Sequence, residues 1–176
     1  DVRFLRAEYL FLLDRLADAA RAYQEFLGGH GDHASALAAS FRIAQVHHDQ
    51  GRWAECLAIA QPMLGKNPEG RLFEQLPFMI GDCLFRQVKW EQAVAALEGF
   101  LATRVKTADG AAPQVTPDPN VDTALMQLAV ARDRLGQKDQ ALRQLAILTG
   151  SYPEPSAQLP LALTEQGRLA FEGGQL

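Results

Sequence analysis

The feature that most constrains this chain is a small residue that recurs at nearly equal intervals within an apolar helical pattern. It stands at Ala7, Ala44, Gly81, Ala129 and Gly167, so the successive steps along the chain are 37, 37, 48 and 38. A second small residue lies twelve positions after each of the first four, at Ala19, Cys56, Ala93 and Ala141. Small residues at fixed positions of successive helices mark places where two helices approach closely, and this period is typical of stacked helical hairpins. The sequence therefore predicts four helix pairs and one unpaired helix.

The unit from Ile43 to Pro68 preserves the pattern best. Ala44 lies in one apolar helical stripe, and Gly51 breaks that helix seven residues later. Trp53 opens a second stripe, and Pro68 closes the unit. This arrangement predicts a helix-turn-helix hairpin.

These residues resemble the tetratricopeptide repeat family, whose signature runs W-x2-L-G-x2-Y, then A-x3-F, then P. The frame is matched by Ile43-Ala44-x2-His47 with Cys56-x3-Ala60 and Pro68, by Leu128-Ala129-x2-Arg132 with Ala141-x3-Leu145 and Pro153, by Ile80-Gly81-x2-Leu84 with Ala93-x3-Leu97, and more loosely by Ala7-x2-Leu10 with Ala19-x3-Tyr23. The signature tryptophan is replaced by Arg3, Ser40, Pro77 and Leu125, and two units have a longer period than the usual repeat of the family. The longer step resembles the repeats of bacterial cell-envelope assembly proteins, a resemblance that favours the periplasm or cell envelope of a bacterium over the cytoplasm.

The resemblance implies an all-α fold, an α-solenoid in which antiparallel helix pairs stack into a right-handed superhelix without strands. We expect one solenoid segment over residues 1–176, with repeats at about 1–32, 33–69, 70–119 and 120–155 and a final helix at 156–173. The one longer step marks an insertion of eleven positions in the segment 104–120, where Gly110, Pro113, Pro117 and Pro119 forbid a continuous helix. We expect this segment to be a surface loop without regular structure.

Glycine and proline predict several helix boundaries. The Gly28-Gly29 pair supplies a stop for the second helix at about residue 27. Pro62 predicts a bend or an early stop near the end of the helix that begins at Trp53. Pro77 and Pro160 fit the first turns of later helices, which makes residues 71–76 a separate turn.

The helices at about 1–13 and 157–171 are apolar on more than one face. A helix that is apolar all round is normally buried all round, and a terminal repeat needs a polar outer face. We therefore expect this chain to be a fragment of a longer solenoid, with end-to-end or homodimer contacts through its terminal helices.

Composition and motifs argue against several classes of function. A net charge of −4 gives no electrostatic reason to bind nucleic acid, so no nucleic-acid partner is predicted. No apolar run is long enough to predict a membrane span. The chain lacks phosphate-loop, nucleophile-elbow and zinc-protease motifs, so neither an enzyme nor a cofactor is predicted. Cys56 and Cys83 lie in apolar stripes, where we expect buried thiols rather than a disulfide.

The loop His30-Gly31-Asp32-His33 brings two imidazoles and a carboxylate close together in sequence, and His47 and His48 follow. Their spacing does not match a zinc signature, and no thiol accompanies them. The favoured interpretation is a polar loop in which Asp32 or Ser35 caps the next helix, so no metal site is predicted.

The resemblance also implies that partners bind the face formed by the first helix of each pair. On each first helix, the residues three before, one after and four after the small residue share that face. These positions predict a partner-binding groove lined by Phe4, Glu8, Phe11, Phe41, Gln45, His48, Phe78, Asp82, Phe85, Met126, Val130, Asp133 and Arg168. Phe4, Phe41 and Phe78 recur at equal steps as an aromatic ladder. The alternative is that these rings belong to the core of each repeat.

The predicted groove offers aromatic and apolar groups with a few carboxylates. Related domains that grip a C-terminal carboxylate use Lys, Arg and Asn instead, and here Arg168 alone is basic. We therefore expect an apolar or aromatic peptide or helix as the ligand. The sequence predicts a non-catalytic protein-interaction module or scaffold, and the alternative is an accessory domain of a larger enzyme or transcriptional regulator.

Overall fold

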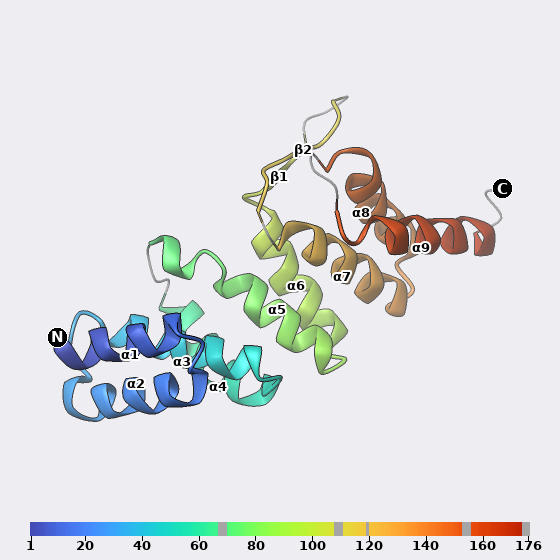
Figure 1. Ribbon diagram of the computed structural model, residues 1–176. Coiled ribbons are helices and arrows are strands. Elements are labelled where there is room, and N and C mark those ends of the chain that lie inside the picture. The colour runs from blue at the N-terminus through green and yellow to red at the C-terminus, as the bar shows by residue number, and fades with distance from the viewer. Residues whose placement is uncertain (67–69, 108–110, 119, 153–155, 174–176) are drawn as a thin grey trace. The chain divides into compact units, whose positions relative to one another are not determined.

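The computed structural model describes residues 1–66, 70–107, 111–118, 120–152 and 156–173 (Figure 1). These residues form helices that pack as consecutive antiparallel pairs, as the small-residue pattern predicted. Contacts between residues divide the chain into two compact units, Asp1–Cys83 and Leu84–Leu176. The boundary lies within one helix, α5 (Leu76–Arg86). Pro68 and Pro153, which the repeat pattern uses as closing residues, lie outside the described residues.

The first unit contains α1 (Val2–Leu12), α2 (Leu16–His30), α3 (Ala36–Asp49), α4 (Trp53–Gly65), a short 3-10 turn η1 (Arg71–Phe73) and the first part of α5. α1 packs against α2, α2 against α3, and α3 against α4. The small residues Ala7, Ala19, Ala44 and Cys56 are fully buried in this unit. A larger side chain at any of them would push two helices apart, so the small-residue pattern sets the helix spacing.

The second unit contains the end of α5, then α6 (Trp90–Leu101), β1 (Val105–Lys106), β2 (Gln114–Val115), α7 (Val121–Arg134), α8 (Lys138–Gly150) and α9 (Leu159–Glu172). α7 packs against α6 and α8, and α8 packs against α9. The fully buried core side chains include Leu97, Phe100, Leu125, Leu145 and Leu169. In this unit too the landmark residues Ala93 and Ala141 have no exposed surface.

The same turn joins the two helices of each described pair. A residue with a left-handed backbone follows the first helix at Asp14 (φ 57°), Gly51 (φ 70°), Val88 (φ 62°) and Gly136 (φ 75°). In each turn the amide of the next residue donates to a carbonyl five residues earlier, at 2.8–3.0 Å: Arg15 to Leu10, Arg52 to His47, Lys89 to Leu84 and Gln137 to Arg132. This is the hydrogen bond that closes a helix with a left-handed residue after it. Glycine is the residue expected there, yet two of the four turns use Asp and Val.

Of the helix boundaries predicted from proline and glycine, some are confirmed and others are wrong. Pro77 is the second residue of α5 and residues 71–73 form a separate turn, both as predicted. Pro160 likewise lies in the first turn of α9. The predicted stop at Gly28-Gly29 is wrong, because α2 continues to His30. The early stop at Pro62 is also wrong, since α4 runs three residues past it.

The expectation of a fold without strands is wrong for the inserted segment. β1 and β2 pair antiparallel, with Val105 opposite Val115 and Lys106 opposite Gln114 (yellow in Figure 1). The amide of Thr116 extends this ladder by donating to the carbonyl of Arg104 at 2.7 Å. Prolines exclude a helix here, but none of them lies within β1 or β2, so they permit a short antiparallel ladder.

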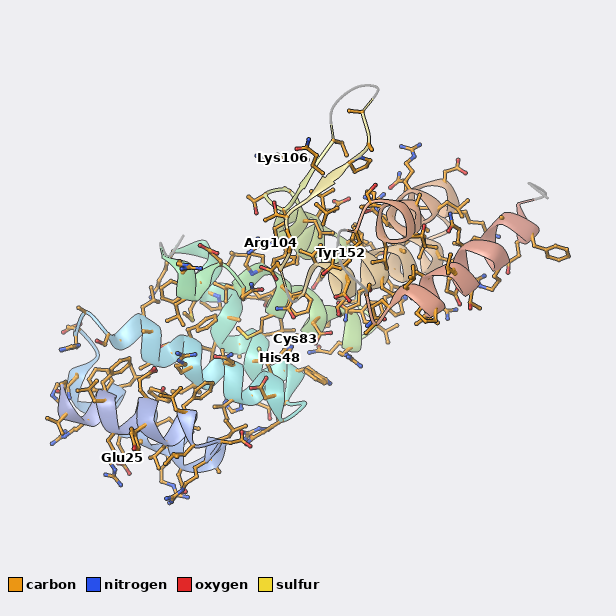
Figure 2. All side chains as sticks on the ribbon, turned by 45° about the horizontal axis from the view of Figure 1, so that its top comes forward. Glu25, His48, Cys83, Arg104, Lys106 and Tyr152 are labelled. Carbon is orange, nitrogen blue, oxygen red and sulfur yellow. The ribbon has the colours of Figure 1, made fainter. Side chains whose placement is uncertain are left out.

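The base of this hairpin is fixed to the second unit by the Arg104 side chain. Its Nε donates to Asp118 at 3.1 Å, and its guanidinium lies 4.0 Å above the Phe100 ring. Figure 2 shows Arg104 at the point where the hairpin leaves α6. Residues 105–106 and 114–115 are therefore not part of a loop without regular structure, while Gly110 and Pro119 lie outside the described residues.

The terminal helices carry large exposed apolar side chains. On α9 Phe171 is 72% exposed, and Leu161 and Leu163 are about half exposed. Association through the ends of the chain stays a prediction. None of the described helices is both long and apolar enough to cross a membrane.

The turn at Val88 generates a stability prediction. A β-branched residue is strained in the left-handed region, and Val88 is 61% exposed, so little burial offsets that strain. We expect Val88→Gly to raise the free energy of unfolding by about 1 kcal/mol, measured by urea denaturation. The reciprocal control is Gly136→Val, where a new Cβ meets no atom within 4 Å. It should lower stability through backbone strain alone, and a Val88→Gly variant no more stable than the parent would contradict the explanation.

Candidate functional site

The first-helix face, meaning the groove positions that the sequence assigns on α1, α3, α5, α7 and α9, is less open than expected. Phe41 and Phe78 are 3% and 8% exposed, so both rings lie in the core. Phe41 packs edge-on against Phe73 of η1, with ring centroids 5.5 Å apart. Phe4 is half-buried and packs against Phe26 at 5.5 Å. An open aromatic ladder is therefore wrong, and the core interpretation holds for Phe41 and Phe78.

The other predicted positions differ in exposure. Asp82 and Met126 are buried and Arg168 is exposed. The half-buried positions are Glu8, Phe11, Gln45, His48, Phe85, Val130 and Asp133. Half-buried side chains on a helix face can still contact a partner, so the assignment of this face to partner binding stays a prediction.

Arg42, which sequence reasoning missed, joins α1 to α3 on this face. Its Nε and Nη2 donate to the Glu8 carboxylate at 3.0 and 3.3 Å, and its Nη1 donates to Gln45 at 3.0 Å. Its guanidinium lies 4.6 Å from the centre of the Phe11 ring. The Tyr23 hydroxyl also donates to Glu8, and burial together with this hydrogen bond raises the pKa of Tyr23 above its usual range. Three predicted groove residues are thus members of one internal network around Arg42.

His48 joins α3 to α5 in the same unit. Its Nε2 lies 2.8 Å from the buried carboxylate of Asp82, and its Nδ1 lies 3.3 Å from Asp49. The Trp53 ring packs edge-on against the imidazole at 5.5 Å. Burial alone would lower the pKa of His48, but the hydrogen bonds to Asp49 and Asp82 and the charge of Asp82 outweigh it and raise the pKa to about 9. His48 is therefore an imidazolium at neutral pH, with both ring nitrogens donating.

In the second unit Arg168 joins α9 to α7. Its Nη2 donates to Asp133 at 2.6 Å, and it also pairs with Glu165 and Glu172 on its own helix. Hydrogen bonds to Glu165, Asp133 and Glu172 raise the pKa of the guanidinium further above its already high value. Beside Asp133, a cavity of about 10 Å³ is lined by the predicted residues Met126 and Val130. That volume holds about one water molecule, so this part of the face is a shallow surface rather than a pocket.

Contacts of this kind join residues at a nearly constant separation in the sequence, and that separation can be recognised without a structure. Each of the following hydrogen-bonded pairs joins residues 34 apart: Glu8 and Arg42, His48 and Asp82, Glu98 and Arg132, Asp122 and Ser156, Lys138 and Glu172. Asp133 and Arg168 are 35 apart. The small landmarks recur at slightly longer steps than this, so in the His48–Asp82 and Asp133–Arg168 pairs a residue four after one landmark meets the residue one after the next. Complementary side chains at this offset are the signal that was missed.

The two thiols and the imidazoles of the loop have structural surroundings. Cys56 and Cys83 are free and buried, and a hydrogen bond between them together with burial raises the pKa of Cys83 above its usual range. His30 and His33 both pack against the Phe26 ring. Among the residues that the structure describes, no three His, Cys, Asp or Glu side chains are arranged to hold a metal ion. Ser35 precedes α3, but its side chain makes no capping hydrogen bond.

Comparisons with known proteins agree with the repeat geometry. Residues 123–155, which cover the fourth predicted repeat, match the family model described as Tetratricopeptide repeat. The fold is that of tetratricopeptide-repeat solenoids. No curated protein sequence matches the chain.

Solved structures resemble the chain along nearly its whole length. YrrB, described as a tetratricopeptide-repeat protein with an unusual peptide-binding site, is 19% identical, with 98% of this chain and 76% of that one covered and a TM-score of 0.73. MamA is 13% identical, with 98% and 81% covered and a TM-score of 0.73. The tetratricopeptide-like repeats of a putative kinesin light chain from Podosopora anserina are 16% identical, with 99% and 86% covered and a TM-score of 0.65. At these identities the likeness concerns the fold, and the cell-envelope resemblance stays a prediction.

The His48 contact predicts a pH dependence of stability. The folded-state pKa of about 9 lies above the ordinary value of 6.5, so the stabilisation is fully present below pH 6.5 and is lost as the pH rises to 9. We expect the free energy of unfolding to fall by roughly 1–3 kcal/mol over that interval. Urea denaturation at pH 6 and pH 9.5 measures it.

The matched variants for that measurement are Asp82→Asn and His48→Gln, each of which removes one partner. Asp49 and Cys83, the other titratable groups beside His48, are unchanged in both. Each variant should flatten the pH dependence whatever its own stability. A slope equal to that of the parent protein would show that His48 does not carry the effect.

Proposed function

We propose that this chain is a non-catalytic scaffold that binds an apolar or aromatic segment of a partner protein at the first-helix positions of one of its two units. The observation that carries the proposal is the combination of repeated helix pairs with half-buried apolar groups on that face. Phe11, Phe85 and Val130 each present part of their surface there. The fold is shared with YrrB, which is described as having a peptide-binding site.

The polar groups of the face support an apolar rather than a charged ligand. Glu8, His48 and Asp133 already pair with Arg42, Asp82 and Arg168. A charged ligand would have to compete with these internal partners, and breaking a half-buried ion pair costs free energy. An apolar side chain needs only the exposed parts of the rings and of Val130, together with the exclusion of water from them. The expected ligand is therefore a short segment with aromatic and aliphatic residues.

The test is a selection of peptides against the purified protein. A random peptide library displayed on phage is selected on the parent protein, and the affinities of the enriched peptides are measured by fluorescence anisotropy. Gln45→Trp in the first unit and Val130→Trp in the second add bulk to the face without changing any charge. Gln140→Trp, on an exposed position of α8, is the matched control.

We expect the selected peptides to be rich in Phe, Tyr, Trp and Leu, and to lose affinity at least tenfold for one of the two face variants, while the control binds as the parent does. Circular-dichroism melts of all three variants report whether folding is retained. Enriched peptides that bind the face variants and the parent equally well would refute the proposal.

A further inference from the structure

A basic cleft lies between α1 and α2 of the first unit. A cavity of about 280 Å³ is lined by Arg3, Arg6, Ala22 and Glu25. It overlaps a second cavity of about 290 Å³ that extends past Leu10 and Arg21 to the Arg15–Asp18 pair. Glu25 marks this side of the unit in Figure 2. The cleft is large enough to receive several side chains of another molecule.

The charge of this cleft differs from that of the chain. Arg3, Arg6, Arg15 and Arg21 stand against two carboxylates, whereas the whole chain has a net charge of −4. Arg15 holds Asp18 at 2.6 Å, and this contact keeps the pKa of Asp18 below its usual range. Among the described residues, the guanidinium groups of Arg3, Arg6 and Arg21 form no ion pair. Three cations are therefore available to a negatively charged ligand.

An apolar stripe runs beside the cleft along α1. Val2, Leu5, Tyr9 and Leu12 are 81%, 63%, 67% and 76% exposed. Their spacing of three, four and three residues places them on one side of the helix. The stripe spans the length of α1, which is 11 residues or roughly 16 Å. On α1 the first-helix face lies on another side, at Phe4, Glu8 and Phe11.

We propose that the stripe and the cleft together bind an acidic amphipathic helix of a partner protein. Apolar residues of that helix would pack on Leu5, Tyr9 and Leu12, and its Asp or Glu side chains would enter the cleft between Arg6 and Arg21. The complementarity is in charge as well as in shape, because a helix with an apolar side and an acidic border fits an apolar stripe bordered by arginines.

The same features argue against an anionic membrane as the ligand. A helix that lies on an anionic membrane is rich in basic residues across its polar face. Here the arginines border the stripe only toward α2, and the other border carries Glu8. The arginines also line a concave cleft, which suits inserted side chains better than a flat layer of lipid headgroups.

The probe is a stapled helix one turn longer than α1, with leucines spaced to match the α1 stripe and glutamates along one border. Its twin carries lysine at each glutamate position. Binding of both to the parent protein is measured by fluorescence anisotropy at low and high salt. The protein variants are Arg6→Glu, Arg21→Glu and Leu5→Asp, all at exposed positions, and the matched control is Arg143→Glu on α8.

We expect the acidic helix to bind the parent protein and the lysine twin not to bind. Arg6→Glu, Arg21→Glu and Leu5→Asp should each weaken binding about tenfold, Arg143→Glu should not, and binding should weaken with salt. Gln45→Trp, on the first-helix face, should leave this binding unchanged, so the result is independent of the scaffold proposal.

Several outcomes would overturn the inference. The acidic helix and its lysine twin could bind equally, or neither could bind. Binding of the protein to phosphatidylserine vesicles that is lost in Arg6→Glu would assign the surface to membranes instead. Dimerisation seen by sedimentation and abolished by Leu5→Asp would assign the stripe to a second copy of the chain.

Discussion

The structure depends on the close approach of neighbouring helices at small residues. Ala7, Ala19, Ala44, Cys56 and Ala93 have no exposed surface, and each lies within the core between packed helices. Because nothing larger fits there, the distance between helices is fixed by these positions. That distance brings side chains of consecutive first helices within hydrogen-bonding reach. The internal contacts of the first-helix face are therefore a consequence of the small-residue pattern.

Those contacts reduce the number of polar groups on the first-helix face that a ligand could bind. Glu8 with Arg42, and His48 with Asp82, connect α1 to α3 and α3 to α5 within the first unit. Asp133 with Arg168 connects α7 to α9 within the second. Such pairs link consecutive first helices, so these polar residues are already bonded within the protein and are less available to ligands. What remains for a partner is the exposed part of the apolar side chains between them.

The fold could be predicted because its determinants are local and periodic. The small residues, Trp53 and Trp90 at the starts of α4 and α6, and Pro77 in the first turn of α5 are each visible in the sequence. The helix stop predicted at Gly28-Gly29 is wrong, because the packing of α2 against α1 and α3 outweighs the low helix propensity of glycine. The left-handed turns at Asp14 and Val88 were not predicted, because neither residue is a glycine, the residue that usually indicates a left-handed backbone.

The site was harder to predict, because exposure depends on what lies opposite a side chain. Periodicity placed Phe41 and Phe78 correctly on the first helices, but it could not show that Phe73 of η1 covers Phe41. The same limit hid Arg42, whose role is visible only when Glu8 lies across from it. The pairing of residues 105–106 with 114–115 was not predicted. Prolines indicate that a segment is not helical, but they do not distinguish a loop from a short antiparallel ladder.

Polar side chains of the first-helix face link successive repeats, and a double-mutant cycle on Glu8 and Arg42 tests this linkage directly. Glu8→Gln and Arg42→Met keep the approximate shape of each side chain, and urea denaturation of the parent, the two single variants and the double variant gives the coupling free energy. We expect a favourable coupling of about 1–2 kcal/mol between these two residues, which are 34 positions apart. Additive effects, with a coupling within about 0.3 kcal/mol of zero, would contradict it.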